Sequence, residues 1–528
     1  MKKSINITKG LLFALVLSGI LFSCSEDIMD EINMDVNHPQ TVKSKYILSD
    51  VITSTAFSNV GGDISTYTSV FVEQEAGTHN QLFRAEHRQN EPSASSTFNN
   101  VWSSLYATLR NARIIIARTS TGGAEEGNRV TRGMAEVLAA LNSALIADMF
   151  GDAPWSEAAI TNPDGTPVNL NPKIDKQQEI YAGVITYLNN AISDLQPASV
   201  DASSSGGPGT NDLLYGGNKA LWLKFAYGLK ARYTMRLLAR STNVAADMNA
   251  VLRYADSSFT SAAEQAAFSV YDASNLNPLF DFQWSRDALA ASESMSQKLI
   301  ERNDPRLRRV FVDPNWMQMT GPADEAFFMA PNGLNEEIQY YYNTSIFTFA
   351  QTAPTLLLSY HEVMFLKAEA LARLNRIPEA RANLRVAVIA AIANTEVSVQ
   401  AAMNAPTILG FGGLTETTAA ITPAEAGAYF DTRVAPLFTA NPLKEIMVQK
   451  YIAFFGASGE STEAYNDIRR LRALNQNFVE LKNPLNANQF PQRLPYGSSD
   501  TTTNPELADA YGDGQYVYTK PVWWAGGS

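Results

Sequence analysis

The stretch DMFGDAPWSEA, Asp148–Ala158, closes a strongly apolar segment and opens a turn. Before it, apolar residues recur at helical spacing over Met134–Met149, which predicts a helix with one buried face. Gly151 suits the left-handed position that ends many helices, and Pro154 cannot continue a helix. We therefore interpret this stretch as the fixed end of a core helix, whose residues report the fold and are not expected to be catalytic.

The same periodicity recurs along the chain and predicts a mostly α-helical fold. Further helices are expected at Gln178–Leu195, Lys219–Leu238, His361–Leu374, Pro378–Ala393, Leu443–Phe455 and Glu463–Leu474. Asn218 is placed to cap the helix that begins at Lys219. Paired helices suggest tetratricopeptide-like units, but no strict repeat of about 34 residues is visible, so an irregular helical domain is the alternative.

Long segments rich in turn residues separate the predicted helices. They are Ala198–Gly209, Val312–Gln351, Asn394–Thr422 and the tail from Asn483. Loops of this length inside a folded chain are usually functional or disordered. The expected fold is therefore mostly α, with tetratricopeptide-like helix pairs and long loop-rich insertions.

The N-terminus has the layout of an exported protein. Positive charges at Lys2, Lys3 and Lys9 accompany an apolar run, Leu11–Phe22, that is shorter than the roughly 20 residues needed to span a bilayer. Leu21–Cys24 resembles the lipobox of bacterial lipoproteins, although a bulky Phe22 stands where a small or hydroxyl residue is usual.

The lone cysteine of the chain is predicted to carry lipid at Cys24, after cleavage of a signal peptide over residues 1–23. Residues 24–40 are then an acidic tether, and residues 41–528 form the binding domain. The alternative is an ordinary secretory signal with an accidental cysteine. With a single cysteine no intrachain disulfide can form.

Composition limits the classes of partner that the protein can have. The chain of 528 residues carries a net charge of −12, which argues against a nucleic-acid partner. After the signal no long uncharged apolar segment follows, so the body is expected to be soluble. The sequence holds 7 Trp, 21 Tyr and 25 Phe, enough to leave some aromatic rings for a surface site after the core is filled.

Motifs for catalysis are missing from the sequence. It contains no HExxH, no G-x-S-x-G and no Walker loop, and its four histidines lack the spacing of a helical zinc site. No cofactor is expected, and metal binding is left unassigned. Four cations at helical spacing are interpreted as a solvated edge whose aliphatic stems cover the core: Lys230, Arg232, Arg236 and Arg240.

Several stretches resemble, in order, the motifs of SusD/RagB-like lipoproteins. They are Trp102–Tyr106, Asp148–Ala158, Tyr215–Asn218, Asn303–Arg306, Glu362–Ala370, Arg493–Tyr496 and Asn504–Glu506. Each motif alone is weak, but their order behind a lipobox is specific. One departure is Gly497, which stands where the family usually has proline.

The resemblance, to the starch-associated SusD-like subgroup, implies a surface-exposed, non-enzymatic lipoprotein of the outer membrane. Such proteins bind oligosaccharides, or less often peptides, and cover a TonB-dependent, SusC-like transporter. Two alternatives stay open: a helical-repeat scaffold or adhesion protein without a small ligand, and a glycan-processing enzyme. The sequence does not decide which glycan or peptide is bound.

The resemblance also implies a site built from an early loop and from mid-chain loops. The candidates are Asn80, Arg84, Trp102, Trp284, Trp316, Tyr340 and Tyr341. Sugar rings stack their C–H faces on Trp and Tyr, and polar side chains hold the hydroxyls. Trp102 lies in a helical pattern, which favours a place in the core over contact with a ligand. Three consecutive tyrosines, 340–342, cannot all face one core, so at least one should be exposed.

Overall fold

Helix α7 (Arg129–Phe150) is the helix that ends at the Asp148–Ala158 stretch, and it is buried along almost its whole length. The structure, a computed structural model, describes residues 42–89, 96–162, 165–202 and 206–528. The predicted signal peptide, Cys24 and the predicted tether lie outside these residues. By length and composition α7 could cross a membrane, as could Ile377–Gly410, but complete burial of α7 marks it as a core helix.

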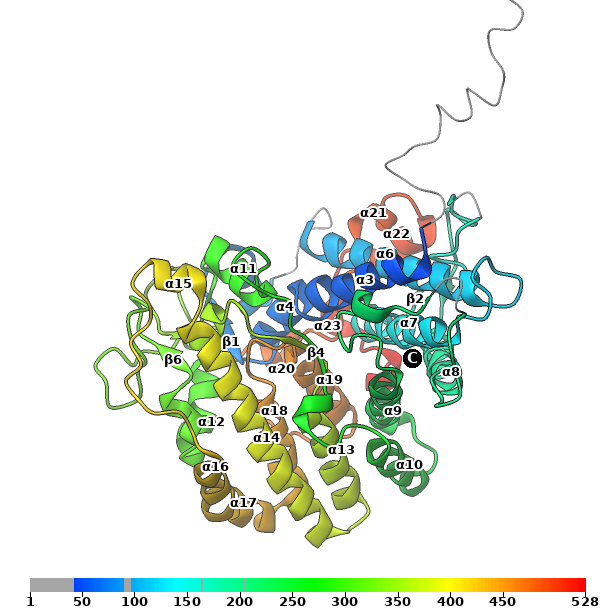
Figure 1. The fold of residues 1–528 in the computed structure, drawn as a ribbon. Coiled ribbons are helices and arrows are strands. Elements are labelled where there is room, and N and C mark those ends of the chain that lie inside the picture. Colours follow the sequence, from blue (N-terminus) through cyan, green and yellow to red (C-terminus); the bar gives the residue numbers. More distant parts are fainter. Residues whose placement is uncertain (1–41, 90–95, 163–164, 203–205) are drawn as a thin grey trace, which may run out of the picture. The chain divides into compact units, whose positions relative to one another are not determined.

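Successive helices pack on one another along the chain, as Figure 1 shows for α8, α9, α10 and α13. The long helices are α3 (Ser44–Ser54), α4 (Asp63–Phe71), α6 (Ser96–Thr119), α7, α8 (Gln177–Asp194), α9 (Lys219–Arg236), α10 (Val244–Asp256), α13 (Tyr360–Arg373), α14 (Ile377–Met403), α18 (Pro442–Ala453) and α19 (Ser461–Ala473). Each apolar face is buried by the neighbouring helix, so the core runs through residues 44–528 as one unit. The predicted mostly α-helical fold is confirmed.

Shorter elements complete this unit. The short α-helices are α5 (Asn80–Glu86), α11 (Pro278–Arg286), α12 (Glu293–Arg302), α15 (Pro406–Gly410), α16 (Pro423–Tyr429), α17 (Ala435–Ala440), α20 (Asn486–Gln489), α21 (Ser498–Thr501), α22 (Pro505–Tyr511) and α23 (Tyr516–Thr519). The π-helical turns are η1 (Thr55–Val60) and η7 (Phe430–Val434), and the 3₁₀ turns are η2 (Gly209–Asn211), η3 (Leu237–Arg240), η4 (Ala262–Glu264), η5 (Pro305–Arg308), η6 (Ile346–Phe349) and η8 (Trp523–Ala525).

Strands are few and short, and in the described residues they form four antiparallel pairs. The pairs are β1 (Glu75–Gly77) with β5 (Leu289–Ala291), β2 (Ala153–Pro154) with β3 (Ile174–Asp175), β4 (Ala266–Phe268) with β8 (Thr355–Leu358), and β6 (Phe311–Val312) with β7 (Thr344–Ser345). In the first pair Glu75 lies opposite Ala291. This pair joins the early segment around α5 to the mid-chain segment around α11.

Of two local predictions at helix ends, the cap at Asn218 is confirmed and the left-handed conformation of Gly151 is not. Gly151 has a positive φ of 77°, and a Cβ there would meet the guanidinium of Arg493 at 3.0 Å. Its ψ of −126° lies outside the left-handed helical region, so the turn is of another type than predicted. Asn218 caps α9 by accepting a hydrogen bond from the backbone N–H of Ala220.

One predicted loop is wrong. The segment Asn394–Thr422 was expected to be irregular, but α14 continues to Met403 and α15 follows it. The extension is helical because Val399 and Ala402 are buried against the core, and this packing outweighs the weak helix propensity of its Thr, Val and Asn residues.

The predicted solvated edge on α9 is also wrong for its two central members. Arg232 is buried, and its Nε and Nη2 donate to the carboxylate of Glu362 at 2.7 and 2.5 Å. Arg236 is buried between Glu463 and Asp148. These two arginines can be buried because carboxylates from neighbouring helices pair with them. Helical spacing in the sequence does not reveal those partners.

Asp148 of the opening stretch is the centre of a buried network. Its Oδ1 accepts hydrogen bonds from the hydroxyl of Tyr181 at 2.5 Å and from the indole N–H of Trp524 at 2.8 Å. Its Oδ2 lies 3.4 Å from Nη1 of Arg236. The motif therefore holds α7, α8, α9 and η8 together, as expected for residues that determine fold.

Candidate functional site

An exposed tryptophan stands at the end of α11. Asn277 caps this helix by accepting hydrogen bonds from the N–H groups of Leu279 and Phe280, and Pro278 occupies its first turn. The spacing of four residues places Trp284 over Phe280, with ring centroids 5.7 Å apart and planes nearly parallel. Phe280 is buried while Trp284 is 41% exposed, so a core ring supports a surface ring.

Two further rings join Trp284 from other parts of the chain. Trp316 lies 6.2 Å from Trp284, and Phe411, just after α15, lies 5.4 Å from Trp284 and 6.1 Å from Trp316. Phe411 is 65% exposed, and Trp316 is half-buried over Phe349. We call Trp284, Trp316 and Phe411 the aromatic platform. Figure 1 shows α11 and α15, which carry two of its segments, close together.

The consecutive tyrosines form a second exposed group. Tyr340 is 69% exposed and Tyr341 is 52% exposed, while Tyr342 is buried, which confirms that the three cannot share one core. Phe328 packs at 5.2 Å against Tyr341 and at 5.0 Å against Tyr342. The exposed ring of Tyr341 therefore packs against Tyr342 and Phe328.

The early segment contacts the loop that carries the tyrosines, and that loop contacts the C-terminal end of α11. The backbone N–H of Asn80 donates to Glu337 Oε1 at 2.9 Å, and Arg84 Nη1 donates to the side-chain oxygen of Asn80 at 3.3 Å. The side-chain amide of Gln339 donates to the carbonyls of Arg286 and Asp287 at 3.0 and 3.3 Å. Segments far apart in sequence thus converge beside Trp284.

Asp287 lies between these groups. It ends α11 in a left-handed conformation with φ of 45°, and Gln283 donates to its Oδ1 at 2.9 Å. Burial raises the pKa of Asp287 to about 6, although the positive charge of His79 opposes this. The carboxylate in turn raises the pKa of the neighbouring Tyr340. The site therefore combines aromatic rings with polar groups of both charges.

Trp102 does not belong to this surface. Its ring is only 1% exposed, and its indole N–H donates to Asp500 Oδ2 at 2.7 Å. It packs against Tyr106, Phe150 and Tyr496 with centroids 4.7 to 5.7 Å away. The prediction that Trp102 contacts a ligand is corrected: the helical pattern around it places it in the core.

The same ring explains the glycine at position 497, where the family usually has proline. A Cβ on residue 497 would lie 2.4 Å from the Trp102 ring, so only glycine fits there.

Sequence reasoning missed Phe411 and Phe328. Both lie in segments that were interpreted only as loops, yet each is an aromatic residue close to glycines or prolines, as Trp284 and Trp316 are close to turn residues. Gly412 and Gly413, both with positive φ, turn the chain directly after Phe411. An aromatic residue beside such a turn was the available signal.

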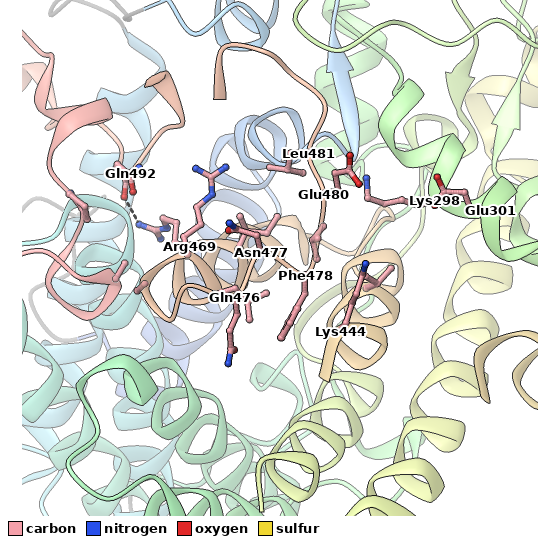
Figure 2. A pocket seen from close by; sticks show the side chains of 18 of the residues that line it. Lys298, Glu301, Lys444, Arg469, Gln476, Asn477, Phe478, Glu480, Leu481 and Gln492 are labelled. Atoms are coloured by element: carbon pink, nitrogen blue, oxygen red, sulfur yellow. Dashed lines mark hydrogen bonds between the residues drawn. The ribbon is translucent and has the colours of Figure 1, made fainter. Parts of the chain in front are cut away.

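A large cavity lies away from these residues. It has a volume of about 830 Å³ and is bounded by α12, α18, α19 and the segment 476–481 (Figure 2). None of the predicted ligand residues lines it. Within the described parts of the chain, no group of three or more His, Cys, Asp or Glu side chains is placed to hold a metal ion.

Comparison with known proteins places this geometry in a family. Residues 36–497 match the family model SusD-like_2, described as starch-binding and associating with the outer membrane. A solved SusD/RagB family protein from Bacteroides thetaiotaomicron is 52% identical, with a TM-score of 0.86, over 92% of this chain and all of that one. None of the curated proteins compared matches the chain.

More distant solved structures share the fold. A chitin-binding protein is 20% identical with a TM-score of 0.69, over 92% of this chain and 99% of its own. A SusD homologue from Bacteroides fragilis is 18% identical with a TM-score of 0.67, over 92% of this chain and all of its own. The order of motifs, the helical fold and these matches agree, and the chain belongs to the SusD-like family, which is described as starch-binding and associating with the outer membrane.

Proposed function

We propose that this protein is a non-enzymatic lipoprotein that binds oligosaccharides at the cell surface and passes them to a TonB-dependent, SusC-like transporter. The observation that carries the proposal is the aromatic platform, in which rings from three separate segments meet at the surface. Trp284 and Phe411 are exposed and Trp316 is half-buried, and the buried rings of Phe280 and Phe349 support them. The description of the family as starch-binding supports a glycan as the ligand.

The geometry of the platform suits sugar rings. The planes of Trp284, Trp316 and Phe411 are inclined to one another by 55° to 81°, so together they form an angled surface and not a flat one. Such a surface can contact the C–H faces of more than one unit of an oligosaccharide. Phe280 and Phe349 fix two of the rings from below, which reduces the entropy lost on binding.

Polar groups near the platform complete the site. Asn80, Arg84, Arg286 and Asp287 lie at the same end of α11 and include donors and acceptors for hydroxyl groups. Exposed Tyr340 and Tyr341 extend the aromatic surface beyond Asp287. We propose that these residues, with Trp284, Trp316 and Phe411, contact the ligand.

Replacement of single platform rings with alanine tests the site. Trp284→Ala, Trp316→Ala and Phe411→Ala should each weaken binding of a starch oligosaccharide severalfold, because a stacked ring contributes about 1 kcal/mol beyond background contacts. Isothermal titration calorimetry with maltoheptaose, chitin oligosaccharides and a peptide library measures the change. Tyr46→Ala removes a ring of similar exposure on α3 and should leave binding unchanged.

The proposal fails if every ligand found binds all three folded variants as tightly as the parent protein. Chromatography of the ligand after incubation tests the second half of the proposal, because turnover of any glycan or peptide would show that the protein is an enzyme.

We also propose that Cys24 carries the lipid that anchors the protein to the outer membrane, next to its transporter. In cells, the native chain should fractionate with outer membranes and retain a large TonB-dependent β-barrel when captured in mild detergent. Cys24→Ala should remove most of the protein from that fraction, because the acyl chains supply about 0.8 kcal/mol per buried CH₂. Unchanged membrane levels of this variant in cells without the transporter would exclude lipid as the anchor.

A further inference from the structure

The large cavity behind α12, α18 and α19 has a basic lining in an acidic protein. Two acidic side chains, Glu301 and Glu480, line it. Five basic side chains face them: Lys298, Arg302, Lys444, Arg469 and Arg472. Figure 2 shows Lys298 and Glu301 on one wall and Arg469 and Gln492 on the opposite one. A local excess of positive charge in a chain with a net charge of −12 requires a physical explanation.

Four of these five cations form no close ion pair with a described residue. Arg302 is neutralised by Glu445, to which its Nε and Nη2 donate at 3.2 and 3.0 Å. The other four basic side chains form no ion pair with any residue that the structure describes. Uncompensated charge beside a cavity favours an anionic ligand, because the ligand supplies the missing partner.

Arg472 presents a fixed guanidinium fork. Its guanidinium lies 3.8 Å from the ring centroid of Phe490, a stacking contact that fixes its plane. Burial lowers the pKa of Arg472, and the guanidinium donates no hydrogen bond to any described residue. The stacked, planar group is therefore available for the paired hydrogen bonds that a carboxylate accepts.

Arg469, one turn earlier on α19, adds positive charge to the cavity lining. Its Nη1 donates to the carbonyls of Asp148 and Gln492, both at 2.8 Å, and it forms no carboxylate pair. Its Nε has no hydrogen-bond partner, although the side chain is almost fully buried. The Nε is enclosed by protein and does not itself face the cavity, so Arg469 contributes its positive charge to the lining and no free donor.

Lys298 supplies positive charge from the opposite wall. Its ammonium donates to the hydroxyl and carbonyl oxygens of Ser294 at 2.9 and 3.2 Å. Burial lowers the pKa of Lys298 to about 8, although Glu73, Glu301 and Glu480 oppose the shift. Burial outweighs these three carboxylates, so a further anion in the cavity would stabilise the charged form.

Neutral groups in the same lining match hydroxyls and a sugar face. The side chains of Gln476, Asn477 and Gln492 offer amide donors and acceptors, and the ring of Phe478 lies between Gln476 and Lys444 (Figure 2). We propose that this cavity is a second binding site, for an acidic sugar whose carboxylate is held by the guanidinium fork of Arg472. The proposal goes beyond the glycan site on the platform, because the two share no residue.

Calorimetry with trigalacturonic acid, its neutral counterpart galactotriose and inorganic phosphate tests this site. The measurements use the Trp284→Ala/Trp316→Ala double variant, so that the platform does not contribute. The acidic trimer should bind and galactotriose should not. Arg472→Gln should weaken binding of the acidic trimer at least tenfold, because the paired charge-assisted hydrogen bonds are lost. Lys298→Met is a second, independent variant and should also weaken it.

Arg433→Gln is the matched control. Arg433 is an exposed cation on η7 that does not line the cavity, and its replacement should leave binding unchanged. Circular dichroism melting confirms that each variant is folded. The proposal is overturned if trigalacturonic acid does not bind, or if it binds equally to the parent, Arg472→Gln and Lys298→Met. Phosphate binding as tight as that of the acidic trimer would also overturn it, because the site would then recognise charge alone. A negative result for the cavity would not count against the proposed glycan site on the aromatic platform, because these measurements use a variant that lacks two of its rings.

Discussion

Replacing Arg470 with methionine should lower the free energy of unfolding by about 3 to 5 kcal/mol, because it leaves a buried carboxylate without its main partner. Arg470 Nη1 and Nη2 donate to the two oxygens of Glu369 at 2.6 and 2.8 Å, and both side chains are almost completely buried. Burial alone would raise the pKa of Glu369, but Arg470 and Arg373 hold it well below its usual range. The pair ties α13 to α19.

Urea unfolding followed by circular dichroism measures this change. Arg376→Met is the matched control, because Arg376 and Glu379 form a similar pair in which both side chains are exposed. Exposed pairs contribute little, so this variant should stay within about 1 kcal/mol of the parent. Equal unfolding midpoints for the parent and Arg470→Met would contradict a stabilising role of the buried pair.

Replacing Glu75 with glutamine should change how stability depends on pH. Burial raises the pKa of Glu75 to about 8, although a hydrogen bond with Ser345 opposes the shift, and its Oε2 has no hydrogen-bond partner in the described residues. In the unfolded chain the group ionises near its ordinary value of 4.5. Between these values the folded chain holds one more proton, so its stability falls as pH rises from about 4.5 to about 8.

Glutamine does not titrate, so Glu75→Gln removes this loss. Relative to the parent, the variant should gain about 3 kcal/mol between pH 4.5 and pH 7, at about 1.4 kcal/mol per pH unit. Urea unfolding at several pH values measures the free energy of unfolding of the variant and of the parent. Subtracting one from the other at each pH cancels the contributions of the other buried acids. Glu325→Gln, at an exposed residue, should give a curve parallel to the parent. Parallel curves for Glu75→Gln as well would show that Glu75 is not a buried acid.

The helices could be predicted because their pattern is local. The core helix expected at Met134–Met149 extends over Arg129–Phe150, and the helix expected from Lys219 begins at that residue with Asn218 as its cap. Periodicity reports which face is buried but not what buries it. The extension of α14 to Met403 and the burial of Arg232 both depend on partners from distant segments, so the sequence pattern could not show them.

The candidate site could be predicted only in part, for the same reason. Trp284, Trp316 and the tyrosines at 340 and 341 stood out because aromatic rings among turn residues are seldom all buried. That Trp284 and Trp316 meet, and that Phe411 joins them, depends on tertiary packing across more than a hundred residues of chain. Trp102 shows the opposite error, since an aromatic residue within a helical period packs into the core.

The partners of Asp148 are made much later than Asp148 itself during synthesis of the chain. Asp148 and Trp524 are separated by 376 residues, and Asn466, another partner, follows Asp148 by 318 residues. At about 5 to 20 residues per second, a ribosome takes roughly 20 to 75 s to make the interval between Asp148 and Trp524. Throughout that time Asp148, near the end of α7, lacks the hydrogen bond from Trp524. The nascent chain therefore cannot complete this part of its core until its last residues have been made.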